Sequence, residues 1–298
     1  MASSVQLDLF LDSRAVTLAN EVIDALSARD ATRATVLLNQ LHHEAPSTTS
    51  LSSLETLRDA LVHWRKPAAD LAAIIRAMQE LDEQVAPAAE GALGPRAHAF
   101  IGGFVRGLAD VAQGLAYDPA HPRVYRASLC LRCGDWKEAE QAAQAIPCSD
   151  QNPDALRWLS VARYRMNGLA AARPTLFELA WREPQRLAAV IRELGDELLD
   201  RDWRAFGQAS EWAGVEEGEL PAWFPAWCLL EHPVIGRELH QVEFPDSPPA
   251  KAARLLLRLV ELERQGNWRR LTLQRQQLRL LSVDLFSLYM ARRAVRLL

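Results

Sequence analysis

Residues 133–139 read Cys133-Gly134-Asp135-Trp136-Lys137-Glu138-Ala139, and this short stretch joins the end of one helix to the start of the next. Glycine can supply the left-handed residue that ends a helix, and an aspartate or asparagine after it can cap the following helix. Three related stretches are Asp200-Arg201-Asp202-Trp203-Arg204-Ala205, Gln265-Gly266-Asn267-Trp268-Arg269-Arg270 and, more faintly, Arg29-Asp30-Ala31-Thr32-Arg33-Ala34. A turn that recurs between helices predicts antiparallel helix hairpins and an all-α fold.

The rest of the sequence also favours helices. Alanine, leucine, arginine, glutamate and glutamine are abundant, and alternating β-branched runs are nearly absent. Asp30, a Ser52–Glu55 capping box, Pro67 and Pro95 mark expected helix starts. We expect helices at about 13–28, 30–43, 53–65, 67–85, 95–116, 121–133, 136–146, 154–167, 170–182, 185–199, 203–213, 250–265 and 268–296.

These elements divide the chain into four parts. Residues 1–12 are expected to be an N-terminal tail, and residues 13–213 a helical-repeat domain. Residues 214–249 hold six prolines together with Trp223, Phe224 and Trp227, and we interpret them as an irregular connection packed by its own aromatics. Residues 250–298 are expected to form a C-terminal helical hairpin rich in arginine.

A period of 34 residues supports a repeat. Asp118-Pro119 and Asn152-Pro153 are 34 residues apart, as are Gly134 and Gly168. Matching small, aromatic and turn positions are Tyr164, Gly168, Phe177 and Ala180 in one unit, and Ala127, Gly134, Trp136 and Ala139 in the unit before it. Departures from the pattern are Cys130, Ala143, Trp158, Arg173 and an early Pro184. Over residues 119–184 the chain resembles the tetratricopeptide repeat, which implies an α-solenoid with a concave protein-binding surface.

Composition and charge limit the classes of function. With 49% hydrophobic and 24% charged residues the chain is globular, and a net charge of -4 argues against nucleic-acid binding by the whole molecule. Residues 269–298 nevertheless carry seven arginines and one acid. No secretion signal or membrane-spanning run is evident, and four cysteines fit free thiols, so we expect a cytoplasmic protein.

No pattern of residues predicts chemistry. Cys130 and Cys133 form a CxxC pair, but it lies at the end of a helix, where the dipole disfavours a thiolate, and no second pair completes a zinc site. The seven histidines form no metal or triad pattern, and Gly102, Gly103 and Gly107 lack the strand that a phosphate loop needs. We therefore expect no metal, no cofactor, no catalytic residue and no enzyme activity.

The N-terminal pentapeptide carries a specific resemblance. Gln6-Leu7-Asp8-Leu9-Phe10 resembles the sliding-clamp-binding motif of bacteria, whose preferred form is Gln-Leu-(Ser/Asp)-Leu-Phe. The resemblance implies that Gln6, Leu7, Leu9 and Phe10 bind a replication clamp, with the Leu-Phe pair in a hydrophobic pocket. The alternative is that Phe10 or Leu11 forms a hydrophobic staple before a helix starting at Ser13.

Two further sites are predicted for partners. The tetratricopeptide resemblance implies that Arg132, Trp158 and Arg165 lie in a concave groove, where two arginines beside an indole suit an acidic or C-terminal peptide. The C-terminal arginines are a solvated face, a docking face or a phosphate-binding strip. The resulting interpretation is a protein-binding adaptor, which the clamp-motif resemblance links to replication or repair. A nucleic-acid-associated accessory protein is the alternative, and an enzyme without a recognisable motif comes third.

Overall fold

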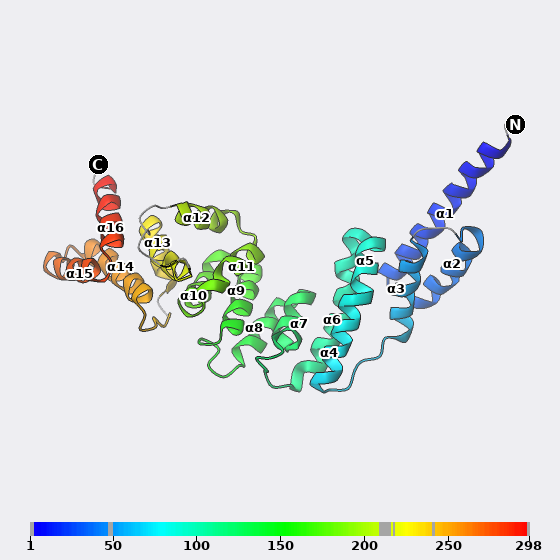
Figure 1. Cartoon of the computed structure of the whole chain (residues 1–298), viewed down its shortest axis with the longest axis horizontal. Helices are drawn as coiled ribbons and strands as arrows, with labels where there is room; N and C mark the ends of the chain where they lie inside the picture. Colours follow the sequence, from blue (N-terminus) through cyan, green and yellow to red (C-terminus); the bar gives the residue numbers. More distant parts are fainter. Residues whose placement is uncertain (1–2, 47–49, 209–215, 217, 240–241, 297–298) are drawn as a thin grey trace. The chain divides into compact units, whose positions relative to one another are not determined.

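The structure is a computed structural model that describes residues 3–46, 50–208, 216, 218–239 and 242–296 (Figure 1). Side chains are described within residues 14–293 of those ranges. Every regular element in the described residues is helical, and none of them is a strand, so the all-α prediction is confirmed. The chain divides into two compact units, Met1–Asp135 and Trp136–Leu298, which are described separately.

The first unit is built from helices that pack on near neighbours in the sequence. Helix α1 packs on α2, α3 on α5, and α6 on α7. A π-helical turn, η1, continues α4 directly into α5. The elements are α1 Ser3–Ser27, α2 Ala31–Glu44, α3 Leu51–His63, α4 Leu71–Glu80, η1 Leu81–Val85, α5 Ala86–Leu93, η2 Gly94–Arg96, α6 Ala97–Val111, η3 Ala112–Gly114, η4 Pro122–Val124 and α7 Arg126–Cys133.

The second unit follows the same rule of local packing. Helix α8 packs on α9, α9 on α10, and α14 on both α13 and α15. Helix α16 contacts α15 and also α13. The elements are α8 Trp136–Gln144, α9 Pro153–Asn167, α10 Leu169–Arg182, α11 Pro184–Leu194, α12 Glu197–Gln208, η6 Leu220–Trp223, α13 Phe224–Glu231, η7 Pro233–Leu239, α14 Pro248–Gln265, α15 Trp268–Leu281 and α16 Val283–Arg296.

Three of the four predicted turns are present. Gly134 and Gly266 end α7 and α14 in the left-handed conformation. Asn267 then caps α15 by accepting a hydrogen bond from the Arg270 N–H at 3.3 Å. In the faint copy, Arg29 itself adopts a positive φ of 57° before Asp30, whose carboxylate caps α2. The helix-ending position therefore accepts a side chain there, at a conformational cost that glycine avoids.

The predicted turn at Asp200–Ala205 is wrong, because those residues lie inside α12. The turn occurs earlier, where Gly195 has a φ of 66° and Asp196 accepts a hydrogen bond from the Leu199 N–H at 2.9 Å. This is the same Gly-Asp chemistry as at Gly134-Asp135. The prediction was based on the tryptophan at position 203, which matches the tryptophan of the other copies. The feature that ends the helix is instead the left-handed glycine.

Several expected helix starts also moved. Helix α1 begins at Ser3 rather than at residue 13, because no glycine or proline interrupts the sequence before Ser27, and the expected tail 1–12 is helical from Ser3. Ser52 lies inside α3, with Ser50 at the N-cap, so the capping box is wrong. Pro67 precedes α4, whose start is capped by Asp70 through a 2.8 Å hydrogen bond from the Ala73 N–H. The expected helix 268–296 breaks at Ser282, which caps α16.

The expected irregular connection 214–249 contains helical elements in its described residues. Pro221 and Pro225 occupy the first turns of η6 and α13, where proline favours helix initiation. The prediction of an irregular segment was wrong here because it treated every proline of the segment as a residue that interrupts a helix. Aromatic residues do pack this segment, as predicted, and they also pack it against neighbouring helices. The ring of Phe224 is fully buried and contacts aromatic rings from α10, α12 and its own helix, namely Phe177, Trp203, Phe206 and Trp227.

Candidate functional site

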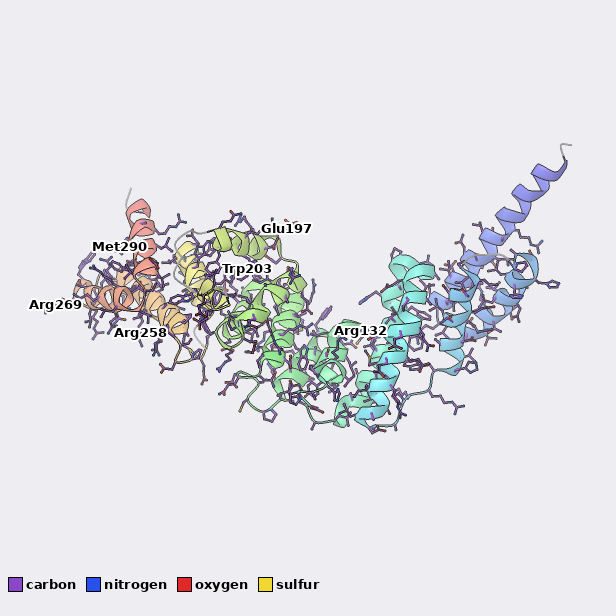
Figure 2. All side chains as sticks on the ribbon, in the orientation of Figure 1. Arg132, Glu197, Trp203, Arg258, Arg269 and Met290 are labelled. Carbon is purple, nitrogen blue, oxygen red and sulfur yellow. The ribbon has the colours of Figure 1, made fainter. Side chains whose placement is uncertain are left out.

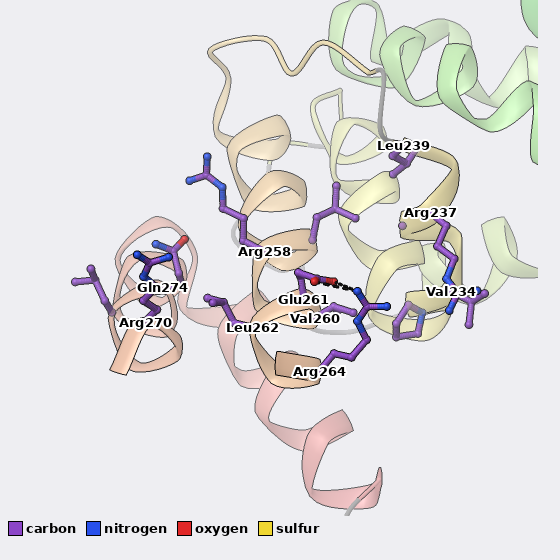
Figure 3. A pocket seen from close by; sticks show the side chains of 14 residues that line it. Val234, Arg237, Leu239, Arg258, Val260, Glu261, Leu262, Arg264, Arg270 and Gln274 are labelled. Atoms are coloured by element: carbon purple, nitrogen blue, oxygen red, sulfur yellow. Dashed lines mark hydrogen bonds and ion pairs between the residues drawn. The ribbon is translucent and has the colours of Figure 1, made fainter. Parts of the chain in front are cut away.

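A groove in the second unit is the candidate site, with α14 between η7 and α15 (Figure 3). Its volume is about 980 Å³, at the upper end of the range for binding pockets. We call it the α14 groove. It is lined by Pro233, Val234, Gly236, Arg237 and Leu239 from η7, by Leu257, Arg258, Val260, Glu261, Leu262 and Arg264 from α14, and by Arg270, Leu273 and Gln274 from α15.

The floor of the groove exists because α14 is apolar on more than one face. Its residues Ala253, Leu256 and Leu259 are buried in the unit. Leu257 and Val260 line the groove and remain half-buried. A helix with apolar residues around most of its circumference normally has neighbours on all sides. One apolar side of α14 is therefore only partly covered by the described residues.

The η7 wall is held in place by a close approach and by an ion pair. A side-chain carbon at Gly236 would lie 2.7 Å from Leu257 Cδ2, so glycine allows η7 to approach the floor at this point. Arg173 Nη1 on α10 donates to both carboxylate oxygens of Glu238, at 2.6 and 2.8 Å. Because the pair is largely buried, it fixes η7 on the body of the unit.

A second contact fixes the segment that follows η7. The ring of Phe244 packs on Trp181 with 5.0 Å between centroids. Near it, the Glu178 carboxyl of α10 accepts a hydrogen bond from the Glu243 backbone N–H. Burial raises the pKa of Glu178 to about 7, so this carboxyl titrates near neutral pH.

The α15 wall is held by a cluster around Glu263. This carboxylate of α14 pairs with Arg293 and accepts a hydrogen bond from the Tyr289 hydroxyl, both on α16. It also lies 3.5 Å from Arg275 on α15. One acid therefore links three consecutive helices, while Gly266 and Asn267 form the turn between the floor and this wall.

The rim of the groove is positively charged. Four arginines line it, and Arg264 pairs with the one lining acid, Glu261, at 2.9 Å. Arg237, Arg258 and Arg270 have no ion-pair partner within the described residues. Figure 3 shows Arg270 on the α15 side of the floor and Arg237 on the η7 side. The groove thus combines an apolar floor with uncompensated positive charge on both walls.

Of the three residues that the tetratricopeptide resemblance places in a groove, Trp158 contradicts that prediction, and the two arginines contact partners within their own units. Trp158 is 1% exposed and packs in the core of the second unit, so its indole does not line a surface. Arg165, in that unit, donates to the Glu193 carbonyl at 3.2 Å and lies over the Tyr164 ring. Arg132, which is labelled in Figure 2, lies in the first unit and pairs with Asp82. The position that the resemblance placed on a surface at Trp158 is therefore a core position in this chain.

The pentapeptide is only partly described. The backbone of α1 includes it, but the side chains of Gln6, Leu7, Leu9 and Phe10 lie outside the described set. A staple that depends on a helix starting at Ser13 is excluded, since α1 starts at Ser3. The clamp-binding hypothesis stays a prediction.

The C-terminal arginines divide between structural and open roles. Arg275 and Arg293 are engaged with Glu263, and Arg292 pairs with Glu231 on α13 at 2.7 Å. Arg269, Arg270 and Arg279 have no ion-pair partner in the described part of the chain. The continuous basic strip that the sequence indicates is therefore interrupted by carboxylates, which weakens the case for a phosphate-binding face.

The cysteine pair has the geometry of structural thiols. Cys130 and Cys133 are buried thiols outside any disulfide, and the Cys133 thiol donates to the Asp135 carboxylate at 3.2 Å. Burial raises the pKa of Cys133 to about 12, far from that of a reactive thiolate. Across the residues that the structure describes, no group of three or more His, Cys, Asp or Glu side chains could hold a metal ion.

Sequence reasoning missed most of the α14 groove. Arg270 was noted within the basic segment, but Leu257, Val260 and Leu273 were not singled out. The available signal was that apolar residues occur on more than one side of α14. In the described ranges no helix combines the length and apolar character that a bilayer crossing requires.

Comparison with protein families, characterised proteins and solved structures finds no match for this chain.

Proposed function

We propose that this chain is a protein-binding adaptor, not an enzyme, and that a partner protein docks in the α14 groove. The observation that carries the proposal is the combination of an apolar floor with three arginines that lack ion-pair partners in the described residues. Apolar side chains and charged groups arranged in this way can bind a complementary surface of another protein without catalysing a reaction. A cytoplasmic location fits the proposal, because all four cysteines are free thiols.

We further propose that the helix hairpins are a diverged tetratricopeptide-like solenoid. Support comes from the family's small and aromatic positions, which are fully buried at Ala127, Ala139, Phe177 and Ala180. Gly134 and Gly168 both have positive φ at the turn position. Repeats of this kind present side chains to partners along their faces, which is consistent with an adaptor.

The test of the adaptor role compares two leucines of similar exposure. Leu273 lines the groove and is 54% exposed, whereas Leu198 on α12 lies outside it and is 58% exposed. Because both side chains are largely in solvent, aspartate at either position should leave the melting temperature nearly unchanged. Leu273→Asp should weaken partner binding about tenfold or more, since a buried leucine contributes about 1.5–3 kcal/mol.

Affinity purification with quantitative mass spectrometry provides the readout. The adaptor proposal predicts a partner that is retained by the parent chain and by Leu198→Asp but depleted with Leu273→Asp. If the same proteins are recovered at the same levels with all three chains, no partner uses the groove and the proposal is wrong.

The pentapeptide supports a second, more specific proposal, in which the chain is tethered to the bacterial sliding clamp. Gln6, Leu7, Leu9 and Phe10 match every preferred position of the clamp motif, with Asp8 between them. A synthetic peptide covering Ser3–Ser13 should then bind purified clamp at about micromolar affinity, or ~8 kcal/mol. Replacing Leu9 and Phe10 with alanine should remove most of that affinity, because each buried side chain contributes about 1.5–3 kcal/mol.

The full chain with Leu9→Ala and Phe10→Ala separates the two roles of this segment. Lost clamp binding with an unchanged melting temperature supports a tether. A lower melting temperature in a chain whose parent never bound the clamp means that these side chains pack on the first helices instead, and the clamp proposal then fails while the groove proposal is unaffected.

A further inference from the structure

We infer that the occupant of the α14 groove is an amphipathic α-helix of a partner protein, with leucine-like residues toward the floor and acidic residues toward both walls. This inference rests on the proposed adaptor function and specifies its partner. It follows from three features of the groove, which are its backbone, its dimensions and its charge.

The backbone of the groove favours a helix over an extended peptide. An extended peptide usually binds by adding to the edge of a sheet, where unpaired backbone groups receive its hydrogen bonds. The α14 floor and the α15 wall are helices whose interior N–H and C=O groups are already paired. An extended backbone laid on them would lose water without gaining partners, whereas a helix satisfies its own backbone groups.

The dimensions of the groove fit about two turns of helix. The lining residues of α14 run from Leu257 to Arg264, which corresponds to roughly 12 Å at 1.5 Å per residue. Two helical turns present three or four side chains on one face, at the spacing i, i+3, i+4 and i+7. Leu257 and Val260 on the floor and Leu273 on the wall provide apolar contacts for such side chains.

The charge of the groove selects an acidic occupant. Arg237 lies on the η7 side and Arg270 on the α15 side, with Arg258 on α14 between those walls (Figure 3). A helix with acids on both sides of an apolar stripe would meet an arginine on either wall. The only lining acid, Glu261, is already paired with Arg264 and offers little to a basic partner.

The same charges disfavour the other occupants. In a symmetric dimer this patch would face its own copy and bring arginines against arginines. Nucleic acid would place phosphates over an apolar floor that has no aromatic stacking platform among its lining residues. A membrane surface favours protruding apolar residues over a concave groove between helices.

The experiment uses the full-length chain and a fluorescein-labelled 18-residue peptide with leucines along one helical face and glutamates on both flanks. Two peptides of the same length serve as controls, one with lysine replacing each glutamate and one with two central prolines that prevent a helix. The chain variant Arg258→Glu with Arg270→Glu reverses two rim charges. Arg269→Glu with Arg279→Glu makes the same change of charge at exposed positions outside the groove.

The inference predicts that fluorescence anisotropy detects binding of the acidic helical peptide only. Its affinity should fall at least about tenfold with the groove variant, and much less with the matched control. Equal binding of the lysine peptide, equal binding of the proline peptide, or an equal effect of the two variants would each overturn the inference. Self-association that Leu273→Asp abolishes would also overturn it in favour of a second copy of the chain.

Failure of the inference is distinguishable from failure of the adaptor proposal. If no helical peptide binds but Leu273→Asp still depletes a co-purifying protein, the groove is an interface and only its occupant has been misassigned. If neither measurement responds to a change in the groove, both proposals fail.

Discussion

Replacing Glu178 with glutamine is expected to stabilise the protein above neutral pH, because the wild-type carboxyl is ionised there within the core of the second unit. Glu178 is 8% exposed, and burial raises its pKa from 4.5 to about 7. Arg182, Arg163 and the Glu243 backbone N–H favour the ionised form, and Asp150 opposes it. The loss of hydration on burial outweighs these contacts. Glutamine keeps an oxygen that can accept the Glu243 hydrogen bond but carries no charge.

The sign and size of the effect follow from the direction of the shift. The folded pKa lies above the unfolded value, so between pH 4.5 and about 7 the unfolded chain loses its proton before the folded chain does. The free energy of unfolding of the wild type therefore falls as pH rises through this window. One pKa unit corresponds to about 1.4 kcal/mol, so the shift from 4.5 to about 7 limits the Glu178 contribution to about 3.5 kcal/mol.

Urea unfolding followed by circular dichroism at pH 5 and pH 8 measures this effect. We subtract the free energy of unfolding of the wild type from that of Glu178→Gln at each pH. This difference should increase by about 1–3 kcal/mol from pH 5 to pH 8. Glu197→Gln on α12 removes an exposed carboxyl and should not show this change. If the wild type and Glu178→Gln have the same pH dependence, the account of the buried carboxyl is wrong.

Two further predictions concern the helix ends and the thiols. Gly266→Ala should lower the free energy of unfolding by about 1 kcal/mol, because alanine disfavours the left-handed φ of 69°. Gly91→Ala, inside α5 with open space around it, should raise the free energy of unfolding by about 0.5–1 kcal/mol. Equal effects of the two variants in urea unfolding would contradict the assignment of the turn. Iodoacetamide at pH 8 should modify the exposed Cys148 well before Cys130, Cys133 and Cys228, and mass spectrometry showing early labelling of Cys133 would contradict its raised pKa.

Local capping signals made much of the fold predictable from the sequence. Asp30 and the Gly266-Asn267 pair act within one helical turn of their own position, and both behave as expected. The errors have local causes too. Pro225 lies in the first turn of a helix, but the many prolines around it predicted an irregular segment. The Ser282 cap was not predicted because apolar and basic residues continue on both sides of it. The turn was predicted at Asp200–Ala205 because Trp203 matches the tryptophan of the other copies, whereas the structure has the cap at Asp196.

The candidate site was much less predictable. The groove depends on Gly236 approaching Leu257 and on Arg173 pairing with Glu238, which are contacts between elements that no local pattern encodes. Trp158 shows the converse error. The offset taken from the tetratricopeptide resemblance placed its side chain on a surface, whereas the structure buries it. Charge composition located the arginines but could not show that some are neutralised by Glu263 while others line a groove.

A photo-crosslinking amino acid placed at Leu273 in cells of the native host tests the adaptor function most directly, with Leu198 as the matched exposed position outside the groove. The account predicts one discrete crosslinked species from position 273 that is absent from position 198 and lost when Arg258 and Arg270 are both changed to glutamate. Identical crosslinking from the two positions, or none from position 273, would contradict a partner-binding role for the groove.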